Sequence, residues 1–201
     1  MTKRVTLKHK LDTKTILFID MDKTLIRPLS HSVHPKGMWD IEFKFDTLSA
    51  IAALNPQYIF IVSNQGGIET GRITEQWVKI KMDFVTMSVK DAIQGNYTIA
   101  YAYAKTNKTS DRLRKPNTGM LEDCLRLYDL EHVPKGKMLM IGDASGGKHD
   151  FSDSDLRCAE NFGIDYLDVN DFVSPSVWKK NASPLRASQL YSTYKTTLLK
   201  A

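Results

Sequence analysis

The sequence lacks any long hydrophobic run. None of its apolar runs approaches the roughly 20 residues that a membrane-spanning helix needs. The N-terminus, MTKRVTLKHKLDTK, is basic but contains no apolar segment of the kind that a secretory signal requires. These two absences predict an intracellular protein with no membrane partner, placed in the cytoplasm or, in a eukaryotic host, in the nucleus.

Cysteine is also scarce. Cys124 and Cys158 lie in helix-like patterns and form neither a CxxC nor a Cys/His spacing, which disfavours a zinc site. We expect two buried free thiols in a reducing compartment. His31 and His34 have no cysteine near them, so this pair indicates a polar loop rather than a metal site.

The remaining composition is that of an ordinary globular protein. The 201 residues are 42% hydrophobic and 25% charged, which is enough for one sizeable domain with a real core. The net charge of +5 modestly favours anionic partners, although each lysine cluster alone is more typical of a solvated face. We predict a monomer with a single domain over 1–201 and a core at about 12–172.

The C-terminal segment 173–201 contains Pro175 and Pro184, which interrupt any long helix. We expect this segment to be a surface helix or docking arm, and the pattern assigns it no function. It is too short to add a kinase domain to these 201 residues.

Apolar, β-rich runs alternate with helical patterns along the chain. The β-rich runs are 15–20, 58–63, 97–104, 137–142 and, more weakly, 165–169, and the helical patterns are 46–54, 74–93, 118–130 and 155–162. This alternation predicts parallel strands joined by helical crossovers, buried on both faces. We therefore predict an α/β fold with a doubly wound, Rossmann-like parallel sheet, whose ligand site lies beyond the carboxyl ends of the strands.

Complementary polar groups follow the first four of these strands. In chain order they are Asp20 and Asp22, Ser63 and Asn64, Lys115, and Asp143. Each could by itself be a turn former, a helix cap or a surface group. Their occurrence at four successive strand ends, which meet at one edge of a sheet, instead predicts a catalytic site.

The residue types indicate phosphate chemistry. Asp20 can attack phosphorus and form an aspartyl phosphate, and Asp22 can protonate the leaving oxygen and then activate water. A hard cation such as Mg²⁺, held by Asp143, would relieve the repulsion between a carboxylate and a phosphate. Ser63 and Lys115 can supply hydrogen bonds and positive charge to the phosphoryl group as it transfers.

One motif favours a different function. Gly142, Gly147 and Lys148 nearly form a nucleotide-binding P-loop. A P-loop needs Ser or Thr after the lysine and a helix that starts there, whereas His149 follows and no helix is expected before about Asp155. We interpret the match as a coincidence and the glycines as a flexible insertion between two acids.

Four segments resemble known motifs. IDMDKTLI, IVSNQGGI, RKPNTGM and IGDASG with a later acid are similar, in order and across 15–165, to the four motifs of the haloacid dehalogenase phosphohydrolase superfamily. More narrowly, SNQGGI, RKPNTGM and GDASG followed by KHDFSDSD resemble the 3′-phosphatase domain of polynucleotide kinase/phosphatase. The region around Trp39 resembles a segment of that family more weakly.

The resemblance implies residue roles. Asp20 would be the nucleophile and Asp22 the acid/base; Mg²⁺ would bind Asp20, the backbone carbonyl of Asp22, and Asp143; Ser63, Asn64 and Lys115 would hold the phosphate; and Thr24 would support the site. The second acid of the last motif is expected four residues after the first, where this chain has Gly147. We assign that role to Asp155, with Asp150 as the rival. Lys23 replaces a common glycine and would add charge at the mouth of the site.

The segment 24–63 is too short for a large inserted cap domain, so we predict a minimal cap and an open site. Basic residues flank this site in the sequence and could attract backbone phosphates: Lys23, Arg27, Lys36, Lys105, Lys108, Arg112 and Arg114. Trp39 or Tyr103 could stack on a base, or each could pack in the core.

The resulting hypothesis is Mg²⁺-dependent removal of the 3′-phosphate from DNA strand ends, as in DNA repair. One rival is a small-molecule phosphatase of the same fold, acting on histidinol phosphate or a sugar phosphate. Another is a catalytically silent module that binds nucleic-acid ends, although the complete set of acids argues against it.

Overall fold

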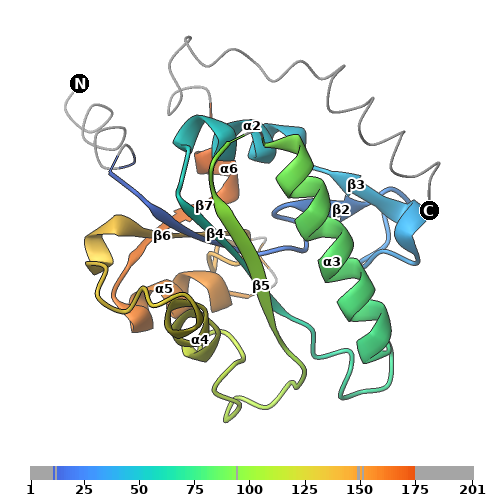
Figure 1. Ribbon diagram of the computed structural model, residues 1–201. Helices are drawn as coiled ribbons and strands as arrows, with labels where there is room; N and C mark the ends of the chain where they lie inside the picture. Colours follow the sequence, from blue (N-terminus) through green and yellow to red (C-terminus); the bar gives the residue numbers. More distant parts are fainter. Residues whose placement is uncertain (1–10, 12, 94, 149, 151, 175–201) are drawn as a thin grey trace.

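The computed structural model describes residues 11, 13–93, 95–148, 150 and 152–174 (Figure 1). The predicted C-terminal arm lies outside these residues from 175 onward. Among the described helices, none combines the length and the apolar character that crossing a membrane requires. Cys124 and Cys158 are both buried and free, as predicted.

A five-stranded parallel sheet forms the centre of the fold. Its strands are β1 (Ile16–Ile19), β4 (Tyr58–Asn64), β5 (Thr98–Ala104), β6 (Met138–Gly142) and β7 (Asp165–Asp168). They are arranged in the order β5-β4-β1-β6-β7, and each neighbouring pair is parallel. The chain therefore winds outward from β1 in both directions, which confirms the predicted doubly wound α/β fold and places the reversal of strand order at β1, where such folds bind their ligands.

Helices cover both faces of the sheet (Figure 1). One layer holds α2 (Phe45–Leu54), α3 (Glu75–Ala92) and the short α6 (Val169–Phe172), and the other holds α4 (Gly119–Leu127) and α5 (Ser154–Phe162). The predicted helix 118–130 ends earlier, because Asp129 adopts a positive φ of 55°. The sequence patterns did not predict α6 or the 3₁₀ helices η1 (Met38–Asp40) and η2 (Lys135–Lys137).

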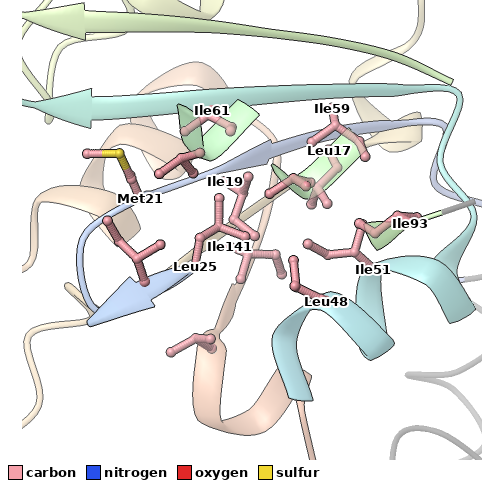
Figure 2. Close-up of a cluster of buried hydrophobic side chains, with 14 of the residues drawn as sticks. Leu17, Ile19, Met21, Leu25, Leu48, Ile51, Ile59, Ile61, Ile93 and Ile141 are labelled. Atoms are coloured by element: carbon pink, nitrogen blue, oxygen red, sulfur yellow. The ribbon is translucent and has the colours of Figure 1, made fainter. Parts of the chain in front are cut away.

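The strands bury both of their faces. Leu17 and Ile19 of β1 pack with α2 residues such as Ile51 in one core (Figure 2). Phe18, between them, points to the opposite core, where its ring lies 5.5 Å from that of Phe60. Successive side chains of a strand alternate between faces, so a continuous apolar run is what two helical layers require.

A two-stranded hairpin forms the cap. β2 (Ile26–Pro28) pairs antiparallel with β3 (Ile41–Phe43), and both lie between Thr24 and α2. The buried carboxylate of Asp40 organises the connecting loop by accepting hydrogen bonds from Ser30 N (2.6 Å), Ser30 Oγ (2.8 Å) and Lys36 N (2.9 Å). This small insertion is the minimal cap that the sequence predicts.

Phe18→Ala should test the central packing. Phe18 is fully buried between two layers, so its truncation should lower the free energy of unfolding by about 3–5 kcal/mol in urea denaturation. Val33→Ala, at an exposed position of the cap loop, should change it by less than about 0.5 kcal/mol. Equal effects of the two substitutions would contradict the assignment of Phe18 to the core.

Candidate active site

The site is built around a buried ion pair between Asp20 and Lys115. Asp20 directly follows β1, and its N–H donates to Ile141 O of β6 at 2.9 Å, which fixes its backbone at the sheet edge. Lys115 precedes α4 and is also buried. Its ammonium donates to Asp20 Oδ1 at 2.6 Å and to Val62 O, near the end of β4, at 2.8 Å.

Two further carboxylates join this pair. Asp143 follows β6, and Asp155 lies in the first turn of α5. One carboxylate oxygen from each of Asp20, Asp143 and Asp155 lies within 4.8 Å of the other two. Asp155 is buried; its Oδ2 accepts from Ala144 N at 3.2 Å, and its Oδ1 lies 2.7 Å from Lys115 Nζ. At an effective dielectric constant near 20, two carboxylate charges 4.8 Å apart repel by about 3.5 kcal/mol.

The proximity of these charged groups shifts the pKa values of Asp20, Asp143 and Lys115. Burial, and then repulsion from Asp155 and Asp143, raises the pKa of Asp20 to about 8, although Lys115 opposes the shift. Burial and the charge of Asp155 raise the pKa of Asp143 as well. Burial would lower the pKa of Lys115, but the carboxylates of Asp155 and Asp20 outweigh it, so that its pKa is raised and its ammonium stays charged.

The three carboxylates could hold a divalent metal ion. Asp155 Oδ1 is buried and, despite its proximity to Lys115, takes part in no well-directed hydrogen bond among the described residues. Three acids surround the buried ammonium of Lys115, and two of the acids, Asp20 and Asp155, are themselves buried. Carboxylate oxygens are the ligands that hard cations such as Mg²⁺ and Ca²⁺ prefer.

Asp22 lies in a different polar network. Its carboxylate accepts from Gln65 Nε2 at 2.7 Å and pairs with the ammonium of Lys81, on α3, at 3.3 Å. Gln65 Nε2 also lies 2.8 Å from the oxygen of Ser63, so the acid and the predicted phosphate-binding hydroxyl belong to one network. The side chain of Asp22 is thus separate from the three-carboxylate cluster; the predicted role of its backbone carbonyl stays a prediction.

Sequence reasoning missed Lys81. The signal is its position on the buried stripe of α3, whose other members are Val78, Met82, Val85 and Val89. A lysine at an apolar position of an amphipathic helix indicates a buried polar partner. Gln65, in the segment SNQGGI, was likewise not predicted to be a site residue.

The other predicted site residues have clear partners. The side chain of Asn64 exchanges two hydrogen bonds of 2.9 Å with the backbone of Lys115, so both its polar atoms already hold the lysine's loop. Thr24 is buried and donates to Asp143 Oδ1 at 3.4 Å. Asn64 and Thr24 therefore position Lys115 and Asp143, respectively.

The loop after β6 separates the two candidates for the last acid. Asp150 accepts from the N–H groups of Ser145 (3.2 Å) and Gly147 (2.8 Å), and so shapes the loop. Asp155, its rival, joins the three-carboxylate cluster. Because α5 begins only at Ser154, the described part of this loop does not place a helix N-terminus directly after Lys148, as a P-loop would require.

Most of the predicted nucleic-acid contacts are paired with acids at the surface. The pairs are Arg27–Glu42, Lys105–Glu75, Lys108–Glu69 and Arg112–Asp123. Arg114 donates to Thr106 O at 3.0 Å, whereas Lys23 and Lys36 are exposed. Exposed ion pairs are weak and exchange readily, so these cations can still meet an anion.

The two aromatic candidates differ. Trp39 is 67% exposed on the cap, so it does not pack in the core. Tyr103 is half-buried on β5, stacks against Tyr101 and donates to Glu75 at 3.3 Å. Trp39 is therefore the better placed of the two to meet a ligand from solution.

Gly142→Ala should disable the cluster without unfolding the protein. A Cβ at residue 142 would lie 2.1 Å from Asp155 Oδ2, so Asp155 must move away from Asp20 and Asp143. The rise in thermal midpoint caused by millimolar Mg²⁺ should be lost. Gly136→Ala, whose Cβ meets nothing within 4 Å, is the control and should keep the rise. An unchanged metal response in Gly142→Ala would contradict the assignment of Asp155.

The raised pKa of Asp20 predicts proton-coupled metal binding. Below about pH 8, the metal-free cluster holds a proton on Asp20 that a cation must displace. The apparent affinity for Mg²⁺ should therefore rise with pH, by up to about 10-fold per unit between about pH 6 and 8, and then level off. Titration calorimetry in buffers of different ionisation enthalpy measures the released proton. Asp20→Asn should bind more weakly and with a flatter pH dependence, and equal slopes would contradict the assignment.

Comparisons with known proteins agree with this geometry. The model of the polynucleotide kinase 3 phosphatase family matches residues 15–173. The chain is 31% identical over 169 residues to the bifunctional polynucleotide phosphatase/kinase of Schizosaccharomyces pombe, covering 80% of this chain and 38% of that protein. It is 28% identical over 196 residues to the polynucleotide 3′-phosphatase of Saccharomyces cerevisiae, covering 73% of this chain and 82% of that protein.

A solved structure shows the same fold. The D,D-heptose 1.7-bisphosphate phosphatase from B. bronchiseptica, complexed with magnesium and phosphate, superimposes with a TM-score of 0.55 at 20% identity, over 76% of this chain and 78% of that one. The family match spans most of the chain, including every residue of the carboxylate cluster. The chain therefore belongs to the polynucleotide kinase 3 phosphatase family and is a phosphatase.

Proposed function

We propose that this phosphatase removes the 3′-phosphate from DNA strand ends, with Mg²⁺ as cofactor and an aspartyl phosphate at Asp20 as intermediate. The observation that carries the proposal is the group formed by buried Asp20, Lys115 and Asp155 with half-buried Asp143 at the carboxyl ends of the strands. The relatives named as polynucleotide phosphatases support the substrate class.

The reaction has two halves. In the first, a carboxylate oxygen of Asp20 forms a bond to phosphorus, the bond from phosphorus to the 3′-oxygen breaks, and Asp22 gives its proton to that oxygen. In the second, water attacks the phosphorus and loses a proton to Asp22. The bond between phosphorus and Asp20 breaks, which regenerates both carboxyl groups and releases inorganic phosphate.

Neighbouring groups supply the charge that this chemistry needs. Lys115 compensates the negative phosphoryl oxygens, while Asp155 and Asn64 hold Lys115 in place. Asp20, the backbone carbonyl of Asp22, and Asp143 would hold Mg²⁺, with Asp155 as the third carboxylate of the metal site and Thr24 orienting Asp143. When bound, Mg²⁺ supplies the positive charge that lets a phosphate dianion approach a carboxylate. The B. bronchiseptica structure, solved with magnesium and phosphate on the same fold, supports this choice of metal.

The small cap supports a macromolecular substrate. A hairpin of two three-residue strands leaves little to enclose a metabolite. Lys23 follows the nucleophile loop, Arg27 lies on β2 of the cap, and Arg114 precedes Lys115, so these three cations would contact the DNA backbone. All proposed catalytic residues come from one chain, which is consistent with a monomer.

A small-molecule phosphatase is the second candidate. The fold is shared with an enzyme named for a heptose bisphosphate, and the same cluster would serve such a substrate equally well. A silent end-binding module is the less favoured alternative, because binding a strand end does not require carboxylates gathered around Lys115.

A side-by-side turnover assay tests the proposal. Oligonucleotides with a 3′-phosphate should release phosphate, whereas 5′-phosphorylated oligonucleotides and histidinol phosphate should release far less, and a chelator should stop the reaction. Asp20→Asn should lower turnover by at least about 1,000-fold, because it removes the nucleophile. Asp46→Asn, an exposed carboxylate on α2, should have no effect.

Each other outcome has a distinct meaning. Preference for histidinol phosphate would favour the small-molecule phosphatase. DNA-end binding without turnover would favour the binding module, and full turnover by Asp20→Asn would exclude Asp20 as the nucleophile.

A further inference from the structure

Lys81 is a buried cation that the reaction described above does not use. Its side chain is 4% exposed on α3, and its ammonium lies 3.3 Å from both carboxylate oxygens of Asp22. It also donates to Gln65 Oε1 at 3.3 Å. Among the described residues, these polar partners of the Lys81 ammonium all belong to the network around Asp22.

Lys81 lies at a position of α3 where an apolar side chain would be expected, so its contacts call for a functional explanation. Its helical neighbours Val78 and Met82 are apolar and fully buried, so an apolar side chain would suit the same stripe. An ammonium taken out of water is costly unless a charged partner and hydrogen bonds compensate it. Here Asp22 provides the charge, and Gln65 provides an additional acceptor.

Gln65 provides the remaining hydrogen bond that holds the Asp22 carboxylate. Its amide nitrogen donates to Asp22 Oδ2 at 2.7 Å and to Ser63 Oγ at 2.8 Å, while its amide oxygen accepts from Lys81. Both ends of the amide are engaged, so its orientation is set by the network. Rotation of the Asp22 carboxyl would break contacts with Lys81 and Gln65 together.

We propose that Lys81 is the positioning residue of the acid/base: with Gln65, it fixes the orientation of the Asp22 carboxyl and faces the charge that forms when Asp22 gives up its proton. This inference rests on the proposed assignment of Asp22 as the acid/base. Lys81 exchanges no proton and touches no substrate.

Lys81 and Gln65 act on Asp22 differently in the two halves of the reaction. When the bond from phosphorus to the leaving oxygen breaks, a proton passes from Asp22 to that oxygen and a carboxylate is left facing the Lys81 ammonium. When water then attacks phosphorus, that carboxylate, still held by Lys81 and Gln65, accepts a proton from the water. Loss of Lys81 removes both the orientation and the compensating charge.

Lys81→Met tests the inference through its dependence on the leaving group. An alkyl oxygen needs a proton as it leaves, whereas p-nitrophenolate does not, so only alkyl phosphates depend on a well-placed Asp22. The variant should lose about 10- to 100-fold in kcat/KM for a 3′-phosphorylated oligonucleotide and for β-glycerophosphate, and less than about 3-fold for p-nitrophenyl phosphate. The oligonucleotide KM should stay nearly unchanged.

Lys14→Met is the matched control. Lys14 is also a buried lysine in an ion pair, with Asp165, and it donates to Gly136 O at 2.7 Å. The loss of this lysine should destabilise the protein in thermal denaturation without changing the ratio of the two kcat/KM values. Lys81→Arg, which retains the charge, should recover part of the alkyl phosphatase activity.

A double substitution separates positioning from general damage. If Lys81 acts through Asp22, then Lys81→Met should cost nothing further in an Asp22→Asn background. An equal loss for alkyl and aryl substrates, or an additive loss in that background, would overturn the inference. If Lys81→Met does not fold, Gln65→Leu should show the same substrate-dependent loss, and an equal loss for both substrates there would also overturn it.

The design keeps this inference distinct from the proposed substrate. β-Glycerophosphate and p-nitrophenyl phosphate contain no nucleic acid, so the leaving-group comparison stands even if 3′-phosphorylated DNA is not hydrolysed. In that case the proposed substrate fails and the role of Lys81 is still decided. If Asp22→Asn itself shows no leaving-group dependence, Asp22 is not the acid, and the inference about Lys81 falls with it.

Discussion

The mutual repulsion of Asp20, Asp143 and Asp155 around the buried ammonium of Lys115 is the constraint on which this site depends. Each carboxylate pair would repel by about 3.5 kcal/mol, so the group persists only because the fold fixes its members. The sheet order sets Asp20 and Asp143 at the ends of adjacent strands, and Gly142 leaves the space that Asp155 fills. The excess of negative charge makes the group a candidate site for a divalent cation. Burial leaves Asp20 and Asp155 poorly solvated.

Asp20 and Asp22, although two residues apart, lie in different electrostatic surroundings: each pairs with a lysine, but only Asp20 also lies beside two further carboxylates. Asp20 faces the carboxylate cluster with burial and repulsion raising its pKa, whereas Asp22 faces Gln65 and the ammonium of Lys81. Met21, between them, is buried in the core and anchors the loop. Different environments around two acids are the usual physical basis for giving them separate roles, and the roles we propose here are nucleophile and proton carrier.

The sequence predicts the sheet well, because short, continuous apolar runs that alternate with helical patterns leave few alternatives to strands buried on both faces. It also predicts that Asp20, Asp143 and Lys115 come together, since strand ends meet at one edge. It does not predict β2 and β3, which are too short to show a period, or the role of Lys81, whose partner is 59 residues away in sequence. The contact of Asn64 with the Lys115 backbone, across 51 residues, likewise depends on the tertiary fold.

The central claim is that the cluster holds Asp20 so that it accepts the phosphoryl group. The most direct measurement is to trap that group: the protein is mixed with Mg²⁺ and a 3′-phosphorylated oligonucleotide, quenched within one turnover and treated with borohydride, which reduces an aspartyl phosphate to homoserine. Peptide mass spectrometry should find homoserine at residue 20 when substrate is present and aspartate when it is absent. Rapid turnover with unmodified Asp20, or homoserine at another aspartate, would contradict this account.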